Sequence, residues 1–122
     1  MNKENKLVPG LPSGFEDRWD KKLLLKKKLL KAIENNFIKF GAEALETPSF
    51  EISENIGSFL AEDDSNPMSD VFSFQDGEKS ITLRYDLSSP LARFVAQNNQ
   101  ELPSIFKRYQ IQNVFRNEKA GN

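Results

Sequence analysis

Four charged side chains in the last third of the chain have a spacing that could serve a ligand: Arg84, Asp86, Arg116 and Glu118. Each pair lies in or directly after a stretch where apolar and polar residues alternate. In a strand this alternation places neighbouring side chains on opposite faces, so one face enters a core while the other presents the charges. A guanidinium offers parallel donors to phosphate oxygens, and a carboxylate can hold an ammonium group. We therefore expect a sheet that presents these four groups to a small zwitterion and a phosphate.

Two strands and a helix are needed to position these charges. The alternating stretches predict strands over 81–85 and 106–115. Asp76-Gly77 predicts a tight turn that joins the first of these strands to an antiparallel partner at 71–74. Pro90 suits the first turn of a helix that follows the 81–85 strand.

A long amphipathic helix is predicted from Asp17 to Phe40. Apolar residues recur at helical spacing, namely Trp19, Leu23, Leu30, Ile33, Phe37 and Phe40. Asp17 is a suitable N-cap, and Gly41 can adopt the left-handed conformation that often ends a helix. Further leucines widen the apolar face, so we expect it to pack on the sheet of its own domain and on a partner subunit. The lysines of the opposite face suit either a solvated surface or a contact with RNA.

Length and composition set limits on the class of protein. A chain of 122 residues with 38% hydrophobic and 29% charged residues suits one α+β domain with a modest core. The formal net charge is −1, so composition alone does not favour nucleic-acid binding. The absence of cysteine and histidine excludes a disulfide, a thiolate nucleophile and a histidine base, while magnesium binding by carboxylates stays open. Apolar runs are too short to span a bilayer, and residues 1–7 lack the apolar region of a signal peptide.

Two stretches resemble segments of histidyl-tRNA synthetases. Leu83-Arg-Tyr-Asp-Leu-Ser-Ser-Pro-Leu-Ala-Arg93 resembles their amino-acid-binding segment. Phe106-Lys-Arg-Tyr-Gln-Ile, followed by Val114-Phe-Arg-Asn-Glu-Lys119, resembles their motif 2, which all class II synthetases share in looser form. Residues 106–122 would therefore be part of motif 2.

Upstream segments extend the resemblance to nearly the whole chain. Residues 17–51, with a long helix, Gly41, a short strand at Ala44-Leu45 and then Pro48, resemble motif 1, which builds the dimer interface in class II enzymes. The stretches 57–60 and 71–76 look like the alphaproteobacterial branch of the family. The resemblance implies an incomplete class II catalytic domain, in which a long N-terminal helix packs on a mostly antiparallel sheet.

The resemblance also assigns roles to individual residues. It implies that Arg116 is the catalytic arginine on the α-phosphate of ATP and that Glu118 is near the adenine. Asp86 and Ser88 would hold the α-amino group of histidine, and Pro48 would lie at the dimer interface. The implied substrates are ATP with Mg²⁺, histidine and tRNA-His, and the implied setting is a cytoplasmic homodimer. No residue is assigned as a metal ligand.

Some positions depart from the family pattern. Ser88 stands where threonine is common, Gln112 where glycine is usual, and Ala120 where related alphaproteobacterial sequences often have proline. Arg84 could be a ligand or could form a structural ion pair, and both alternatives stay open. Since the chain stops inside the motif 2 loop, we expect the isolated chain not to form histidyl-adenylate.

Two other functions compete with a histidine–tRNA ligase. The first is a regulatory relative of the synthetase that serves as a subunit of ATP phosphoribosyltransferase. The second is an unrelated α+β interaction module. The motifs Arg116-Asn-Glu118 and Leu83-Arg-Tyr-Asp86 favour the ligase.

Overall fold

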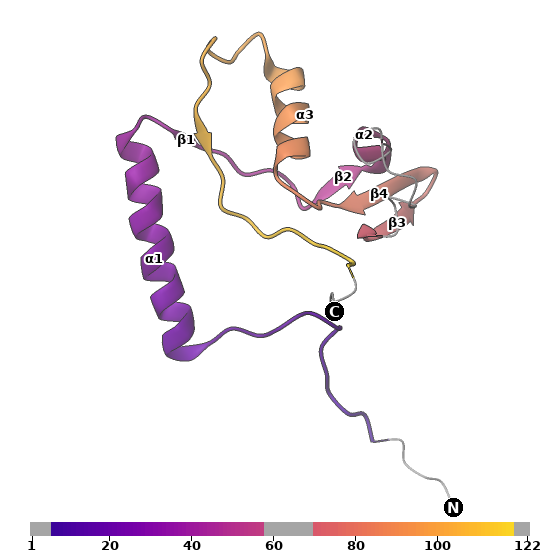
Figure 1. Cartoon of the computed structure of the whole chain (residues 1–122). Coiled ribbons are helices and arrows are strands. Elements are labelled where there is room, and N and C mark those ends of the chain that lie inside the picture. The colour runs from indigo at the N-terminus through magenta and orange to yellow at the C-terminus, as the bar shows by residue number, and fades with distance from the viewer. Residues whose placement is uncertain (1–5, 58–69, 119–122) are drawn as a thin grey trace, which may run out of the picture. The chain divides into compact units, whose positions relative to one another are not determined.

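The computed structural model of the chain describes residues 6–57 and 70–118, which divide into two compact units, 1–36 and 37–122 (Figure 1). The elements in chain order are α1 (Asp20–Lys39), β1 (Glu43–Ala44), β2 (Phe50–Ile52), α2 (Ser53–Gly57), β3 (Ser73–Asp76), β4 (Lys79–Leu83), α3 (Ser88–Asn98) and β5 (Arg108–Tyr109). This α+β composition, with one long helix and a mostly antiparallel strand arrangement, confirms the predicted fold class.

Helix α1 confirms the predicted long helix, although it begins three residues later than Asp17. Asp20 has a left-handed φ of 60°, which interrupts any helical path from upstream, so Asp17 is not the N-cap. At the other end Gly41 has a φ of 80°, as predicted, and its N–H donates to the carbonyl of Ile38 at 3.0 Å. No residue of α1 is buried.

The main sheet is antiparallel and has the order β2-β4-β3. Its register places Ile81 opposite Ile52 on one side and Phe74 on the other. The predicted turn joins β3 to β4, and Gly77 adopts a φ of 61° there. Pairing on β3 runs over residues 73–76, two positions later than the predicted strand at 71–74.

Hydroxyl groups hold the centre of this sheet. Thr82 has no exposed surface, and its Oγ1 lies 2.5 Å from Ser53 Oγ and 3.1 Å from Ser73 Oγ. These pairs link all three strands through side chains, because Ser53 directly follows β2 and Ser73 opens β3. Each buried hydroxyl thereby obtains the partner that it needs away from water.

The motif 2-like segment forms much less regular strand than predicted. β5 covers only Arg108–Tyr109 and pairs in parallel with β1. The prediction of one strand over 106–115 is therefore wrong in length. Tyr109 is buried, and its ring stacks on Phe37, from the last turn of α1, with ring centroids 5.7 Å apart.

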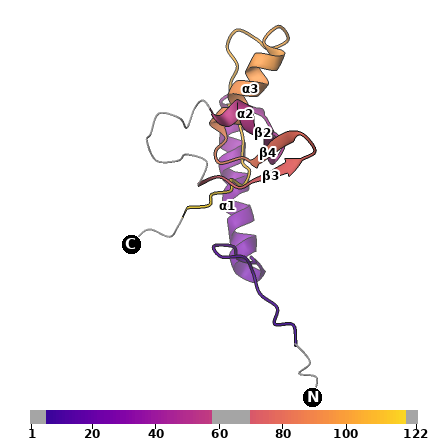
Figure 2. The same cartoon turned by 90° about the vertical axis from the view of Figure 1, so that its right-hand side faces the viewer.

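The two short helices lie beside the main sheet, and Figure 2 shows α2 at the sheet from a second direction. Pro90 is buried in the first turn of α3, as predicted. Arg93 of α3 donates two hydrogen bonds to the buried Glu51 of β2, from Nε at 2.8 Å and from Nη2 at 3.0 Å. This bidentate pair fixes α3 to the sheet directly after the predicted amino-acid-binding residues. The predicted helical stretch 58–60 lies outside the described residues.

Candidate functional site

Arg84 is buried at the junction of three chain segments. Only 3% of its surface is exposed. Its Nη1 donates to the carbonyl of Thr47 at 2.8 Å, and its Nε donates to the carbonyl of Asn113 at 2.6 Å. No carboxylate pairs with Arg84 within residues 6–57 and 70–118. The expectation that Arg84 faces a ligand is therefore wrong, and its partners are backbone carbonyls rather than the carboxylate of an ion pair.

Thr47 and Gln112 form a second link between the same segments. The backbone N–H of Thr47 donates to Gln112 Oε1 at 3.0 Å, and Gln112 Nε2 donates to the Thr47 carbonyl at 3.2 Å. Gln110 Nε2 reaches both Gln112 Oε1, at 2.7 Å, and Thr47 Oγ1, at 2.8 Å. An amide side chain thus replaces the backbone pairing that the predicted strand would have supplied. Gln112 has a structural role that glycine could not fill.

The structure brings Arg116 and Glu118 together around one residue that the sequence analysis did not assign, Tyr85. The guanidinium carbon of Arg116 lies 4.5 Å from the centroid of the Tyr85 ring. Arg116 Nε also donates to the Tyr85 carbonyl at 3.2 Å. On the far end of the ring, the Tyr85 hydroxyl donates a short hydrogen bond to Glu118 Oε1. Tyr85 therefore contacts both residues assigned to ATP.

The backbone on either side of this cluster is also fixed. The N–H of Phe115 donates to the carbonyl of Arg84 at 2.9 Å, which sets the segment of Arg116 beside that of Tyr85. The N–H of Asn117 donates to the carbonyl of Asp70 at 2.9 Å. Arg116 and Glu118 are exposed, and backbone hydrogen bonds of Phe115 and Asn117 fix the segment that carries them.

Glu118 changes the acidity of the tyrosine. The hydrogen bond to Glu118 raises the pKa of Tyr85 above its ordinary value of 10.0, and the negative charge of that carboxylate acts in the same direction. Arg116 opposes the shift, because a nearby cation favours the phenolate. The hydroxyl therefore stays protonated, and so a donor, at neutral pH.

The predicted histidine-binding residues, Asp86 and Ser88, follow Tyr85 closely in the sequence. Asp86 is half-buried in the loop between β4 and α3, and Ser88 is the exposed first residue of α3. Ser88 lines an open pocket between α2 and α3 whose other lining residues include Glu54 and Arg93. No hydrogen bond joins Asp86 to Ser88 in the described part of the chain. Pro48 is exposed between β1 and β2.

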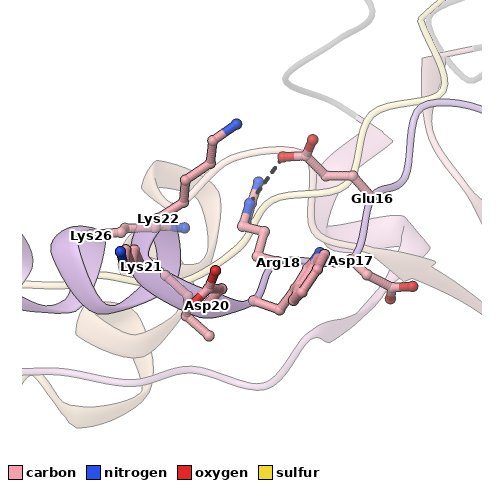
Figure 3. A pocket seen from close by; sticks show the side chains of 9 residues that line it. Glu16, Asp17, Arg18, Asp20, Lys21, Lys22 and Lys26 are labelled. Atoms are coloured by element: carbon pink, nitrogen blue, oxygen red, sulfur yellow. Dashed lines mark hydrogen bonds and ion pairs between the residues drawn. The ribbon is translucent and has the colours of Figure 1, made fainter.

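A second open pocket surrounds the start of α1 and contains none of the predicted site residues (Figure 3). Lysines of the first helical turns, Lys21, Lys22 and Lys26, line it together with Trp19. Arg18 donates to Glu16 there at 3.0 Å, so one of the cations is already paired.

Tyr85, Thr47 and Gln110 are the functional or supporting residues that sequence reasoning missed. The glutamines had a detectable signal, because 110 and 112 are two apart and so share one face of an extended segment. Tyr85 had none, since its partners are more than 30 residues away in sequence. Within the described ranges no group of three acidic side chains could hold a metal ion, and no helix is long and apolar enough to cross a membrane.

Comparison with known proteins gives relatives along the whole chain. The histidine–tRNA ligase of Pelagibacter ubique is 84% identical over 122 residues, which are 100% of this chain and 26% of that protein. The histidine–tRNA ligase of Methylocella silvestris is 46% identical over 91% of this chain and 22% of its own length. The chain thus spans about a quarter of the length of the curated relatives it matches.

Solved structures agree with these relatives. Histidyl-tRNA synthetase from Nostoc sp. PCC 7120 superposes with a TM-score of 0.76 and 27% identity, over 89% of this chain and 25% of that one. A Bacillus halodurans protein described as an ATP phosphoribosyltransferase regulatory subunit/histidyl-tRNA synthetase has a TM-score of 0.78 over 93% of this chain, and its 24% identity shows a shared fold. The family model of the tRNA synthetases class II core domain (F) matches residues 16–122. Since this match covers most of the chain, the chain belongs to the class II tRNA synthetase core domain family.

Proposed function

We propose that this chain supplies the ATP α-phosphate site and the histidine amino-group site of a histidine–tRNA ligase. The observation that carries the proposal is the cluster of Arg116, Tyr85 and Glu118, in which Tyr85 directly precedes Asp86 in sequence. Relatives at 84% and 46% identity that are named histidine–tRNA ligases support it. Residues 17–51, 83–93 and 106–122 would then be motif 1, the amino-acid-binding segment and part of motif 2.

The first reaction of such an enzyme joins the carboxylate of histidine to ATP. A carboxylate oxygen attacks the α-phosphorus, the new oxygen–phosphorus bond forms, and the bond to the bridging oxygen breaks to release pyrophosphate. The carboxylate is already ionised, so no proton has to be removed and no histidine base is needed. Catalysis therefore depends on aligning the reactants and on neutralising charge at the phosphorus.

Arg116 is suited to the second of these tasks. Its Nε is taken by the Tyr85 carbonyl, while neither Nη1 nor Nη2 has a hydrogen-bond partner among the described residues. Those two nitrogens form the open fork that can donate hydrogen bonds to two phosphate oxygens. Negative charge grows on these oxygens in the transition state, so the fork binds the transition state more strongly than the substrate. Glu118 would meet the adenine, as an acceptor for its amino group.

Asp86 is proposed to hold the α-ammonium group of histidine, with the Ser88 hydroxyl as a second acceptor. Asp86 directly follows Tyr85 in the chain, and joining a carboxylate to phosphorus requires the ammonium site and the phosphate site to be neighbours. Mg²⁺ would bind through the phosphates of ATP. No residue of this chain is assigned to the metal.

Further partners follow from the same proposal. The complete enzyme would transfer histidine to tRNA-His in the cytoplasm and would act as a homodimer through the motif 1 region, including Pro48. Exposed apolar side chains on and beside α1 support a subunit contact, among them Trp19 at 74% exposure and Leu25 at 70%. The regulatory alternative has weaker support, since its named structural relative is only 24% identical.

A hybrid ligase tests the proposed function. In this hybrid the chain replaces the matching 26% of the Pelagibacter ubique protein. We expect histidine-dependent exchange of pyrophosphate into ATP at a rate close to that of the unmodified Pelagibacter protein. A hybrid that folds with the same dimer mass and thermal stability but shows no exchange would contradict the proposal.

A further inference from the structure

Tyr85 lies between two residues that are proposed to bind different parts of one nucleotide. Its ring carries the Arg116 guanidinium on its face, at 4.5 Å, and its carbonyl accepts from Arg116 Nε at 3.2 Å. Its hydroxyl donates to Glu118 Oε1. One side chain therefore supports both the residue assigned to phosphate and the residue assigned to adenine.

The contacts with Arg116 leave its phosphate-binding edge open. An arginine side chain has many rotamers, and an exposed one loses this conformational entropy when substrate binds. Here the guanidinium carbon lies over the Tyr85 ring and the carbonyl accepts from Nε, so the position and the direction of the fork are both set in advance. Nη1 and Nη2 stay without partners in the described residues and can point at a ligand. Such preorganisation makes a donor effective at developing charge.

The hydroxyl contact acts on Glu118 in a similar way. Glu118 is exposed, and a carboxylate on a flexible side chain would otherwise sample many rotamers. The hydrogen bond from Tyr85 fixes Oε1 and leaves the other oxygen available. The two contacts are chemically separable, because phenylalanine keeps the ring and loses only the hydroxyl.

We propose that Tyr85 is a positioning residue that presets Arg116 through its ring and carbonyl and Glu118 through its hydroxyl, before ATP binds. This inference rests on the proposed function, and it adds a residue to which neither motif assigned a role. Removing the ring should lower the rate of adenylate formation, since Arg116 then loses its orientation. Removing only the hydroxyl should weaken ATP binding, because Glu118 acts on the adenine.

Variants of the hybrid ligase separate these effects. In Tyr85→Leu we expect kcat for exchange to fall about fivefold, the value of a cation–π contact of moderate strength. In Tyr85→Phe we expect kcat to be kept and the KM for ATP to rise about threefold. Phe74→Leu is the matched aromatic control, because Phe74 is half-exposed on β3 and packs edge-on against Phe50 at 5.5 Å. This control should leave both constants unchanged.

A double variant distinguishes positioning from general stability. If Tyr85 acts through Arg116, Tyr85→Leu should cause no further fall in kcat when Arg116→Ala is already present. An equal fall in both backgrounds, or a similar fall in Phe74→Leu, would overturn the proposal. An active hybrid whose kcat is unchanged by Tyr85→Leu would do the same and would leave the proposed function intact.

A spectroscopic measurement on the 122-residue chain is independent of activity. The guanidinium of Arg116 lies over the Tyr85 ring, so the ring current should displace the Nε–H resonance of Arg116 from that of an exposed arginine, and this resonance should move in Tyr85→Leu. Tyr85→Phe should keep the displaced position. An unshifted Arg116 resonance in the unchanged chain would refute the preset geometry, even if the hybrid proved inactive and the proposed function failed.

Discussion

Arg84 and Arg116 both lie in or directly after alternating segments, and the sequence predicts that both face a ligand. In the fold Arg84 is 3% exposed, and its Nη1 and Nε donate to the carbonyls of Thr47 and Asn113. Arg116 is exposed, and its Nη1 and Nη2 have no hydrogen-bond partner among the described residues. Burial therefore separates an arginine that holds segments together from one that can meet a ligand. The type of residue and its spacing do not make that distinction.

The two arginines are also supported differently. Arg84 is held by hydrogen bonds to backbone atoms, which cannot move away unless the chain moves, and its guanidinium carbon also lies 6.0 Å from the centroid of the Phe115 ring. Arg116 is held by an aromatic face and one carbonyl, contacts that set its direction and still leave its outer edge accessible. A buried cation with satisfied donors supports stability, and an exposed preset cation supports binding.

Removal of Arg84 should have the largest effect. Arg84→Ala breaks two charge-assisted hydrogen bonds, at 2.8 and 2.6 Å, and leaves the Thr47 carbonyl with Gln112 Nε2 as its remaining donor, so we expect a loss of about 4 kcal/mol in the free energy of unfolding. Thermal and urea unfolding of the chain, followed by circular dichroism, measure it. Arg84→Lys should recover only part, because an ammonium cannot reach both carbonyls in the same geometry. Equal stability of Arg84→Ala and Arg116→Ala would remove the distinction.

Removal of Arg116 should have the opposite profile. In the hybrid ligase we expect Arg116→Ala to slow adenylate formation at least a hundredfold, or about 3 kcal/mol, and to change the unfolding free energy by about 1 kcal/mol or less. Single-turnover adenylate formation over a histidine titration is the measurement. Arg116→Lys should rescue poorly, since it keeps the charge but lacks the fork. A change confined to histidine affinity would show that the role assigned to Arg116 is wrong.

Asp86 sharpens the comparison by testing the neighbouring ligand site. Asp86→Asn keeps the size and removes the charge, so histidine should bind about tenfold more weakly while the single-turnover rate at saturating histidine changes little. Asp76→Asn is the matched control, because Asp76 is exposed in the β3–β4 turn. Unchanged histidine affinity in Asp86→Asn would exclude Asp86 from the ammonium site.

The smallest effect concerns the ionisation of Tyr85. Its pKa is raised by the hydrogen bond and the charge of Glu118, with a small contribution from Asp70, and is lowered by Arg116. The stabilisation is thus present below pH 10.0 and is lost as pH rises through the raised value. Ultraviolet titration of the chain should show that Tyr85 ionises at higher pH than free tyrosine. Glu118→Gln should lower the pKa of Tyr85 back toward 10.0. Tyr85→Phe identifies the transition, and an unaltered curve in Glu118→Gln would contradict the contact.

Local patterns were sufficient to predict several elements. The helix at Asp20–Lys39, the turn at Gly77 and the helix that contains Pro90 depend on periodicity and backbone preference within a few residues. Family resemblance likewise indicated Arg116 and Glu118 as neighbours, which the structure brings together through Tyr85. The helices and the turn need no knowledge of the rest of the chain.

Tertiary structure alone decided which side chains became internal supports. Arg84 meets carbonyls 37 and 29 residues away, and Tyr85 meets Glu118 33 residues away. Alternation assigns a residue to one of two faces of a strand but does not identify the residue that packs against it. Alternation also predicted a strand that continues to residue 115, whereas pairing with β1 ends at Tyr109. Beyond that point the Gln112 amide supplies the missing backbone pairing with Thr47, because a side chain can satisfy buried donors and acceptors when no strand is alongside.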